Sequence, residues 1–331
     1  MKKHPLRVVQ FGLGPIGCAV ARLVNERSDL ELIGGVDIDP EKTGKDVGTI
    51  IGLDKELGFP VVSSLKEVLD RTAADVVTHT TSSYFDLFKL QIEEILQSGL
   101  DIVSTAEELS FPWLENYVVA NELDEVAKQA GKTVLGTGVN PGFLMDTLPL
   151  TITGICQKVD YISVTRVINA SERRGPFQAK IGSGMSVEAF MEKMESGRMG
   201  HVGLPESMGM LFDTLGERME RYDDSVEPVV AEKLTKTDAF TVQPGEVKGL
   251  KQVARGFGAN GEFAKLTFIA ALDMEDDGDT IQIKGRPDLE VKLKGTNGDL
   301  STVAMVVNAV RRVHEAPAGL VTMRDIPPVT A

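Results

Sequence analysis

Apolar residues in the first part of the chain follow strand and helix periodicities in alternation. Leu6–Phe11 is a short β-rich run, and apolar side chains then recur at helical spacing through residues 16–27. Ser64 and Glu67 have the spacing of a capping box, which predicts the start of a short helix. The same patterns predict further strands at 30–36, 76–80, 102–104 and 133–135, and helices at 84–98 and 113–129 with Gly131 as C-cap. Such alternation is typical of a parallel sheet with right-handed crossovers.

The pattern changes after residues 140–142, where strand candidates follow one another more closely. Short turns join the later candidates, which favours an antiparallel sheet. The candidates are strands at 161–168, 229–234, 248–257, 264–272, 280–284 and 289–293, with helices at 187–195 and 205–215. A last helix is predicted at 300–313, where Val303, Val306 and Val310 share one face.

Composition and charge narrow the possible partners. The 331 residues are enough for two domains with separate cores. An excess of 49 acidic over 35 basic residues gives a net charge of −14, which disfavours nucleic acid and anionic membranes as partners. The longest apolar run is shorter than the ~20 residues that a membrane-spanning helix needs. With two cysteines and no signal-peptide pattern at the N-terminus, we expect a cytoplasmic protein.

A glycine-rich loop joins the first predicted strand to the first helix. Its sequence, Gly12-Leu13-Gly14-Pro15-Ile16-Gly17, matches the dinucleotide-binding pattern G-x-G-x-x-G in the required strand–loop–helix context. In that pattern the first glycine permits the tight turn, the second lets a pyrophosphate approach the backbone, and the third allows close packing. The helix N-terminus then offers N–H groups to the phosphates. These six residues are therefore predicted to bind a dinucleotide cofactor.

Asp37 lies at the end of the second predicted strand, about 20 residues after the last glycine of the loop. An acidic residue at this place binds the ribose 2′-hydroxyl of NAD. Lys42 and Lys45 are the nearest basic residues on that side, and either could reach a 2′-phosphate. We therefore expect NAD or NADP, with NAD slightly favoured. The alternative for Asp37 is a solvated turn residue.

These features together predict an α/β fold, namely a Rossmann-type doubly wound parallel sheet with a second α+β domain built on a largely antiparallel sheet. The dinucleotide-binding domain is expected to span residues 1–142. A substrate and dimerisation domain is expected at 143–298. The last helix and tail, 299–331, are expected to return to the first domain.

Polar residues gather where two predicted strands end, at 78–83 and at 104–112. Ligands of an open α/β sheet bind outside the carboxyl ends of its strands. Both segments are therefore expected to line the nicotinamide end of the cofactor, and Thr80, Thr81 and Ser82 are predicted to contact it.

The second of these segments holds adjacent carboxylates at Glu107 and Glu108, which are candidates for proton transfer. A helix start would also favour acidic residues there, through its dipole. His79 is interpreted as a structural residue. We find no Cys/His/Asp cluster with zinc spacing and no serine-nucleophile motif, so no metal is expected.

Several of these segments together resemble the 2,4-diaminopentanoate dehydrogenases and the related native amine dehydrogenases. The N-terminal domain of this group is similar to that of dihydrodipicolinate reductase. The resemblance is carried by Gly12–Gly17, by Asp37-x-Asp39-Pro40, by residues 104–112 (Ser-Thr-Ala-Glu-Glu-Leu-Ser-Phe-Pro), by residues 136–143 (Gly-Thr-Gly-Val-Asn-Pro-Gly-Phe), and by residues 180–184 and 316–320. It extends over most of the chain.

This resemblance implies that Glu108 handles the amine and water. Asn140 is further predicted to contact the cofactor, and Phe143 to line the substrate pocket. The family often has Cys where Ala106 stands, a departure that affects little. Related sugar and inositol dehydrogenases carry a Glu-Lys-Pro motif at the same strand end. No Lys occurs between Leu100 and Asn121, so an alcohol oxidation that relies on that Lys is disfavoured.

The leading hypothesis is an NAD(P)-dependent amine dehydrogenase, which converts a primary amine to a ketone and ammonia and also runs in reverse. Reduction of a cyclic imine or oxidation of an alcohol on the same scaffold is the second hypothesis. A non-catalytic protein that senses NAD(P) is the third, because a fold alone does not define a function.

The substrate-binding residues are less defined by the sequence. A 2,4-diamino acid needs a cation for its carboxylate, and Arg173 and Arg174 are candidates, with a solvated turn as the alternative. His201 lies in a Gly-rich loop and is a candidate contact. Glu107 is a further candidate, although neighbouring residues at a strand end should point in opposite directions. Because residues 264–272 look apolar on both faces, we also expect a homodimer.

Overall fold

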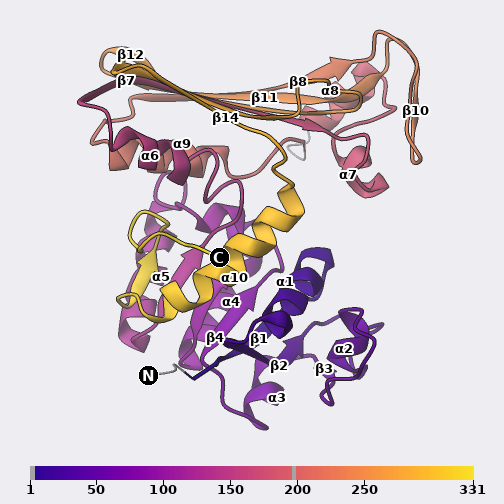
Figure 1. The fold of residues 1–331 in the computed structure, drawn as a ribbon, viewed down its shortest axis with the longest axis vertical. Coiled ribbons are helices and arrows are strands. Elements are labelled where there is room, and N and C mark those ends of the chain that lie inside the picture. The colour runs from indigo at the N-terminus through magenta and orange to yellow at the C-terminus, as the bar shows by residue number, and fades with distance from the viewer. Residues whose placement is uncertain (1–3, 196–198) are drawn as a thin grey trace. The chain divides into compact units, whose positions relative to one another are not determined.

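The computed structural model describes residues 4–195 and 199–331 (Figure 1). The chain divides into two compact units. The first unit runs from the N-terminal part to Phe143 and also includes Asn297–Ala331, and the second unit is Leu144–Thr296. No helix within the described residues is both long enough and apolar enough to cross a membrane.

A parallel sheet forms the centre of the first unit, with the strand order β15-β6-β5-β4-β1-β2-β3. Its strands are β1 (Leu6–Phe11), β2 (Leu30–Val36), β3 (Val61–Val62), β4 (Val76–His79), β5 (Asp101–Ser104), β6 (Thr133–Gly136) and β15 (Gly319–Val321). The order 3-2-1-4-5-6 is that of a doubly wound dinucleotide-binding sheet, in which the chain changes direction between β1 and β4. The predicted Rossmann-type sheet is confirmed, and β15 extends it at one edge.

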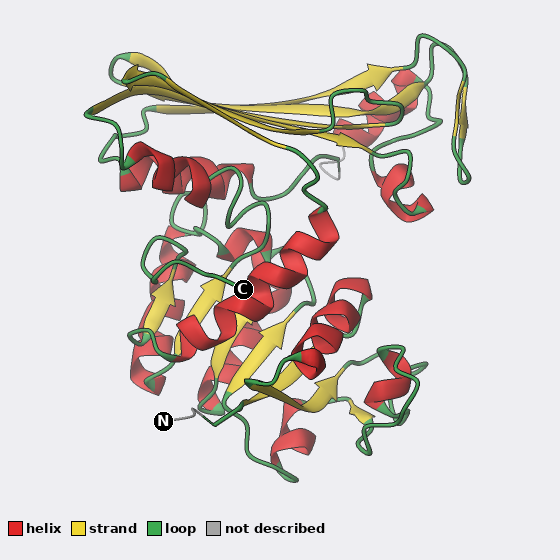
Figure 2. Ribbon diagram, in the orientation of Figure 1, coloured by secondary structure: helices red, strands yellow, loops and turns green. Residues whose placement is uncertain are grey.

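Helices cover both faces of this sheet (Figure 2). They are α1 (Pro15–Glu26), α2 (Val47–Ile50), α3 (Leu65–Leu69), α4 (Phe85–Gln97), α5 (Tyr117–Ala130) and α10 (Gly298–His314), with a 3₁₀ turn, η1 (Glu107–Leu109). Because successive strand residues face opposite sides, Val8 packs in the core beneath α1 and α10, whereas Val9 packs beneath α4 and α5. The predicted last helix therefore belongs to the core of the first unit.

The second unit is built on a sheet in the order β14-β13-β7-β12-β11-β8. Its strands are β7 (Lys158–Asn169), β8 (Arg221–Val230), β11 (Val247–Gly258), β12 (Gly261–Ala271), β13 (Gly278–Arg286) and β14 (Leu289–Leu293). All neighbouring pairs are antiparallel except β7 and β12, which run parallel. The expected largely antiparallel sheet is confirmed, with one parallel pair at its centre. A small hairpin, β9 (Thr235–Lys236) and β10 (Thr241–Val242), lies outside this sheet.

The helices of the second unit are α6 (Thr147–Thr153), α7 (Gly175–Lys180), α8 (Val187–Glu195) and α9 (Leu204–Thr214). Of these helices, α6, α7 and α9 lie on the same side of the sheet in Figure 2, where α8 overlaps it. Inward side chains such as Val164, Leu266 and Ile281 form the core with Met208 and Phe190 of these helices. The methionines between residues 185 and 210 therefore serve mainly as core, in keeping with their adaptable side chains.

Some element boundaries differ from the sequence predictions, for identifiable reasons. The strand expected at 229–234 overlaps only the end of β8, which begins at Arg221. The earlier residues of β8 were not predicted as a strand, because β8 is an edge strand and many of its residues are polar. The chain leaves this strand after Val230, where the Ala231 N–H donates to the Glu246 carbonyl oxygen. Helix α5 starts at Tyr117 rather than 113, because residues 111–115 form turns.

Candidate active site

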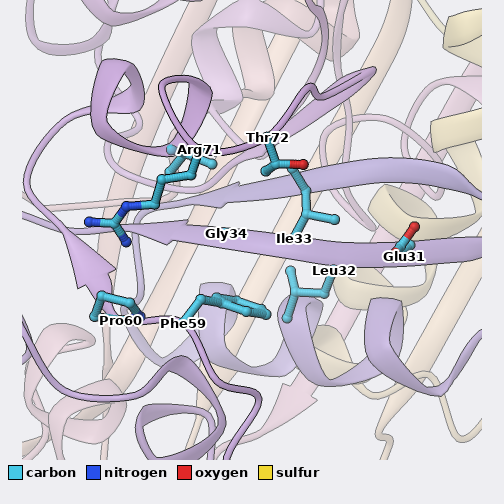
Figure 3. Close-up of a pocket in the computed structure, with 9 residues that line it drawn as sticks. Glu31, Leu32, Ile33, Gly34, Phe59, Pro60, Arg71 and Thr72 are labelled. Carbon is cyan, nitrogen blue, oxygen red and sulfur yellow. The ribbon is translucent and has the colours of Figure 1, made fainter.

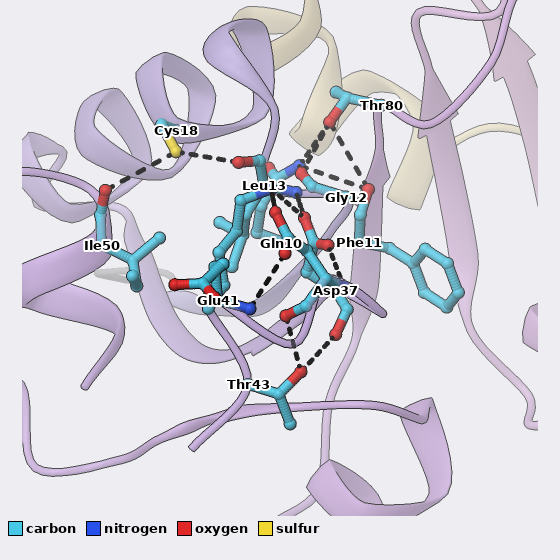
Figure 4. Close-up of polar contacts among 12 residues, drawn as sticks. Gln10, Phe11, Gly12, Leu13, Cys18, Asp37, Glu41, Thr43, Ile50 and Thr80 are labelled. Carbon is cyan, nitrogen blue, oxygen red and sulfur yellow. Dashed lines mark hydrogen bonds and ion pairs between the residues drawn. The ribbon is translucent and has the colours of Figure 1, made fainter. Parts of the chain in front are cut away.

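The glycine loop is held by a buried polar side chain from the strand before it. Gln10 is fully buried, and its Nε2 donates to the Gly12 carbonyl oxygen at 2.8 Å and to Thr80 Oγ1 at 2.8 Å (Figure 4). Thr80 Oγ1 in turn donates to the same Gly12 oxygen at 2.8 Å. Gly12 has a φ of +89°, which glycine adopts without strain. Sequence reasoning missed Gln10, although a lone amide inside an apolar strand was a visible signal.

The other two glycines of the loop have opposite surroundings. A Cβ on Gly17 would lie 1.9 Å from the Gly12 carbonyl oxygen and 2.5 Å from Thr80 Oγ1. A Cβ on Gly14 would meet no protein atom within 4 Å. Gly17 therefore permits the close packing of α1, whereas Gly14 leaves open space beside the helix N-terminus, as a pyrophosphate requires. Pro15 is at the first helical position, where no N–H is needed.

Asp37 follows β2 and is bonded to the loop. Its Oδ2 accepts from the Leu13 N–H at 2.7 Å and from Lys42 Nζ at 3.0 Å, and its Oδ1 accepts from the Asp39 N–H at 2.9 Å. Burial alone would raise the pKa of Asp37, but these donors bind the ionised form and together lower the pKa below its ordinary value. The carboxylate is therefore ionised and fixed where a ribose hydroxyl could donate to it.

The polar residues after β4 make contacts within the protein. Thr81 Oγ1 donates to Gln91 Oε1 at 2.6 Å and is 2.9 Å from His79 Nε2. Ser82 Oγ accepts from the Tyr84 N–H at 3.2 Å. Together with the bond from Thr80 to the glycine loop, these contacts fix the backbone of the segment. Any cofactor contact from Thr80, Thr81 or Ser82 would have to share hydroxyls that are already bonded.

The His79 side chain, at the end of β4, is bonded to α4 and to the end of β5. Its ring is fully buried, with Nε2 2.8 Å from Gln91 Oε1 of α4 and Nδ1 2.8 Å from Ser104 Oγ at the end of β5. Ser104 Oγ also accepts from the Ala106 N–H, just before η1. Burial lowers the pKa of His79 to about 4, so the ring is neutral near pH 7. The interpretation of His79 as a structural residue agrees with this network.

The two candidate carboxylates lie on η1 rather than on an extended strand end. Successive residues of a 3₁₀ turn project about 120° apart, so the argument from opposite strand faces was wrong, although the side chains still diverge. The turn packs directly on Gly136 at the end of β6, where a Cβ would lie 2.5 Å from the Leu109 carbonyl carbon. The Glu108 N–H donates to the Ser83 carbonyl oxygen at 3.3 Å. The β4–α4 loop and β6 therefore fix the position of Glu108.

The Glu108 carboxylate is half-buried near the start of α4. Its Oε2 accepts from the Phe85 N–H at 2.6 Å. Burial raises the pKa of Glu108 above 4.5, this hydrogen bond opposes the rise, and the charges of Glu115, Asp86 and Glu107 add to it. The dipole interaction expected for a helix start is thus present. A raised pKa also brings the carboxyl group closer to the range in which a general acid–base group exchanges protons.

The segment after β6 is compact. The Asn140–Pro141 bond is cis, and Gly142 has a φ of +117°, with an added Cβ only 2.6 Å from the Gly138 N. The Val139 N–H donates to Thr302 Oγ1 of α10 at 3.3 Å. Asn140 and Phe143, the residues predicted here as cofactor and substrate contacts, are both partly buried.

The predicted substrate residues of the second unit have different environments. The Arg173 guanidinium lies over the Phe177 ring, 4.8 Å from its centroid, whereas Arg174 is exposed at the N-cap of α7. The His201 ring stacks on Phe268 with 4.7 Å between the ring centroids, and the backbone N–H of His201 donates to Gln252 Oε1 at 2.6 Å.

A buried charge pair in the second unit was missed by sequence reasoning. Arg166 and Asp279 are 3% exposed each, and Arg166 Nη1 lies 3.5 Å from Asp279 Oδ1. Neither of these two atoms has a hydrogen-bond partner within the described residues. Burial lowers the pKa of Arg166 and raises that of Asp279, while their mutual attraction opposes both shifts. The available signal was an arginine in the inward, apolar phase of β7, where Ile162 and Val164 precede it.

Other features contribute less to a site. A cavity of about 310 Å³ lies beside the first half of β2, between Phe59 and Arg71 (Figure 3). None of the predicted site residues lines it. Within the two described stretches, no three His, Cys, Asp or Glu side chains are grouped as metal ligands. Cys18 and Cys156 are free thiols.

The fold and the glycine loop are typical of two-domain, dinucleotide-dependent dehydrogenases. Residues 143–331 match the family model for the 2,4-diaminopentanoate dehydrogenase C-terminal domain, and residues 6–106 match that for the N-terminus of dihydrodipicolinate reductase. A 2,4-diaminopentanoate dehydrogenase from Acetoanaerobium sticklandii is 31% identical over 97% of this chain and 93% of its own. The chain therefore belongs to the 2,4-diaminopentanoate dehydrogenase family, as the resemblance predicted.

Two amine dehydrogenases are also similar to this chain. An amine dehydrogenase from Streptomyces virginiae is 24% identical over 97% of this chain and 96% of its own. The solved structure of an amine dehydrogenase from Mycobacterium smegmatis has a TM-score of 0.85, with 24% identity over 98% of this chain and 97% of that one. The structural match shows a shared fold.

The contrast between Gly14 and Gly17 gives a prediction. Gly14→Ala should leave the melting temperature within ~2 °C of the parent, because its Cβ meets no protein atom. It should weaken NADH binding about tenfold or more, because the added Cβ would occupy the space through which the pyrophosphate approaches the backbone. Gly17→Ala should instead destabilise the fold by ~1–3 kcal/mol through overpacking. Thermal unfolding and NADH fluorescence titration measure the two effects, and a destabilised Gly14→Ala with normal NADH binding would contradict the assignment.

Proposed function

We propose that this chain is an NAD(P)-dependent amine dehydrogenase that oxidises a primary amine of the 2,4-diaminopentanoate type to a ketone and ammonia, and catalyses the reverse reductive amination. The observation that carries the proposal is the half-buried Glu108 carboxylate at the carboxyl ends of the parallel strands, on the sheet that carries the glycine loop. The names of the Acetoanaerobium and Streptomyces relatives support the same chemistry.

The proposed cofactor contacts follow from the loop geometry. The segment Gly12–Gly17 would hold the pyrophosphate through Gly14 and the start of α1, and Asp37 would bind the ribose. Thr80, Thr81, Ser82 and Asn140 are proposed to line the nicotinamide end. The nicotinamide would accept a hydride from the amine-bearing carbon. NAD is proposed as the slightly favoured cofactor, because Asp37 is ionised and partly buried.

Glu108 is proposed as the acid–base residue. An ionised Glu108 would take a proton from the substrate ammonium, so that the neutral amine can lose hydride. Glu108 would then release that proton to solvent, and the ionised carboxylate would stabilise the iminium and accept a proton from the water that adds to it. The protonated Glu108 would give this proton to the amine nitrogen, so that ammonia leaves as the hydroxyl loses its proton and the ketone C=O forms. The raised pKa of Glu108 supports a group that gives and takes protons in one cycle. Glu107 and Phe143 are proposed as neighbouring substrate contacts.

A carboxylate on the substrate would need a cation, and the second unit offers three arginines for this role. Arg173 already contacts the Phe177 ring and Arg174 is exposed. Arg166 is the one whose Nη1 is buried without a hydrogen-bond partner among the described residues. We therefore favour Arg166 over the two arginines named from the sequence. His201 supports this choice, because Phe268, on which it stacks, is the register partner of Arg166.

A cytoplasmic homodimer is proposed for the assembled enzyme. The homodimer was expected from the sequence because residues 264–272 look apolar on both faces, and that reason was wrong. The second face of β12 carries Lys265 and Thr267 besides Ile269 and is not apolar throughout. The support is instead that α6, α7 and α9 of this unit lie on the other side of its sheet, which leaves one face available for a second copy.

The roles of the paired carboxylates can be separated by substitution. Glu108→Ala should lower kcat for amine oxidation by ~10²–10⁴-fold, the usual cost of losing a general acid–base group, with little change in NADH affinity. Glu107→Ala is the matched control and should be much milder. Steady-state rates and NADH titration of both variants test this. A swapped pattern would assign the role to Glu107, and two mild variants would contradict the amine dehydrogenase proposal.

The pH dependence of the same reaction tests the ionised form of Glu108. Because its pKa is raised, kcat/KM for amine oxidation should fall on the acid side as Glu108 is protonated, with a midpoint above 4.5. The limb at high pH comes from deprotonation of the substrate ammonium that Glu108 acts on. Glu108→Gln should retain only the substrate limb. If the two profiles have the same shape, Glu108 is not the base.

Carboxylate recognition is tested by removing both members of the buried pair. The double variant Arg166→Met, Asp279→Leu avoids an uncompensated buried charge. Its kcat/KM for 2-amino-4-oxopentanoate should fall ~10–100-fold, whereas that for acetone should change less than ~3-fold. Arg173→Met serves as the surface control. Equal losses on both ketones would show that Arg166 has only a structural role.

A further inference from the structure

Lys42 lies between two carboxylates just after the strand that carries the ribose-binding aspartate. Its Nζ is 3.0 Å from Asp37 Oδ2 and 3.3 Å from Asp39 Oδ2. The side chain keeps 26% of its surface exposed, so it can leave these partners without disturbing a core. Lys42 is therefore both bound to the ribose-binding residue and able to move.

The loop that carries Lys42 is itself well fixed. The N–H groups of Lys42 and Thr43 donate to the Asp39 carbonyl oxygen, both at 3.0 Å, and the Gly44 N–H donates to the Val61 carbonyl oxygen of β3 at 2.9 Å. Thr43 Oγ1 donates to the Asp37 carbonyl oxygen at 3.1 Å (Figure 4). The turn thus returns the base of Lys42 to the end of β2, and the flexible part is the side chain alone.

The charges of Asp37, Asp39 and Lys42 have different effects on the binding of NAD and of NADP. A ribose 2′-hydroxyl can donate to the remaining acceptor capacity of Asp37 Oδ1, whose one bond comes from the Asp39 N–H. A 2′-phosphate carries about −1.5 to −2 charges and would meet the charges of Asp37 and Asp39. Only a cation placed at these carboxylates can offset that repulsion, and Lys42 is such a cation.

We propose that Lys42 is the 2′-phosphate subsite of this enzyme, and that its ammonium transfers from Asp37 and Asp39 to the phosphate when NADP binds. The inference rests on the proposed dinucleotide-dependent function. With NAD, Lys42 keeps its carboxylate partners. One side chain thus allows both cofactors, and Asp39, which competes for the same ammonium, limits the affinity for NADP.

Two other cations near the loop are less suited to this role. Arg22 donates through Nε to the Ile51 carbonyl oxygen at 2.6 Å, which directs it to the segment after α2. Lys45, the second candidate from the sequence, is exposed in the loop. It therefore serves as the matched control, because it has the same charge and lies three residues further along.

Equilibrium binding tests the subsite without turnover. Dissociation constants for NADPH and NADH would be measured by fluorescence titration, and those for 2′,5′-ADP and 5′-AMP by calorimetry. Lys42→Met keeps the aliphatic stem and should weaken NADPH and 2′,5′-ADP about tenfold or more, with NADH and 5′-AMP changed less than ~3-fold. Lys42→Arg should restore most of the loss, and Lys45→Met should have little effect.

Asp39→Asn provides the converse measurement. The amide keeps the oxygen that accepts from the Glu41 N–H but removes the competing charge, so NADPH binding should become tighter. The proposal is overturned if Lys42→Met weakens both cofactors equally, if Lys45→Met is the damaging variant, or if the parent binds NADH but no NADPH. If the parent binds neither dinucleotide, the proposed function fails as well.

Discussion

The first unit depends on the close approach of α1 to the ends of β1 and β4. Only glycine at position 17 allows this approach, because any side chain would overlap the Gly12 carbonyl oxygen and the Thr80 hydroxyl. Gln10 and Thr80 both donate to that oxygen and so fix the loop from inside the sheet. The contact lies between β1 and β4, where the strand order reverses and ligands of such sheets bind. The position of the cofactor loop is therefore a consequence of packing.

In the same unit as this loop, the pKa of Asp37 is lowered and the pKa of Glu108 is raised. Asp37 receives backbone N–H groups and an ammonium, which keep its charge in spite of burial. Burial of Glu108, together with its acidic neighbours, favours the neutral form, although the Phe85 N–H opposes this shift. A fixed charge suits ribose recognition, whereas a group that can be protonated suits catalysis. The different surroundings thus explain why two acids of the same unit can have different proposed roles.

Much of the first unit could be predicted from the sequence, because local patterns specify β1, the glycine loop, α1 and the position of Asp37 at the end of β2. The 3₁₀ turn of Glu108 could not be predicted, since it depends on the distant Gly136 and Ser83. Pairing of Arg166 with Asp279 requires the register of β7 and β13, which a single sequence does not reveal. Most of the edge strand β8 was also not predicted, because its polar residues lack the alternation of apolar residues that marks a covered strand.

Coupling of hydride transfer to ammonia, and not to an alcohol, distinguishes an amine dehydrogenase from the other dehydrogenases considered above. It is tested by following NADH oxidation with 2-amino-4-oxopentanoate while ammonium consumption is recorded in the same reaction. We expect NADH to be oxidised only when ammonium is present, with one ammonium consumed per NADH and a diamine as the product. Equal NADH oxidation without ammonium, with an alcohol as the product, would contradict the amine dehydrogenase proposal.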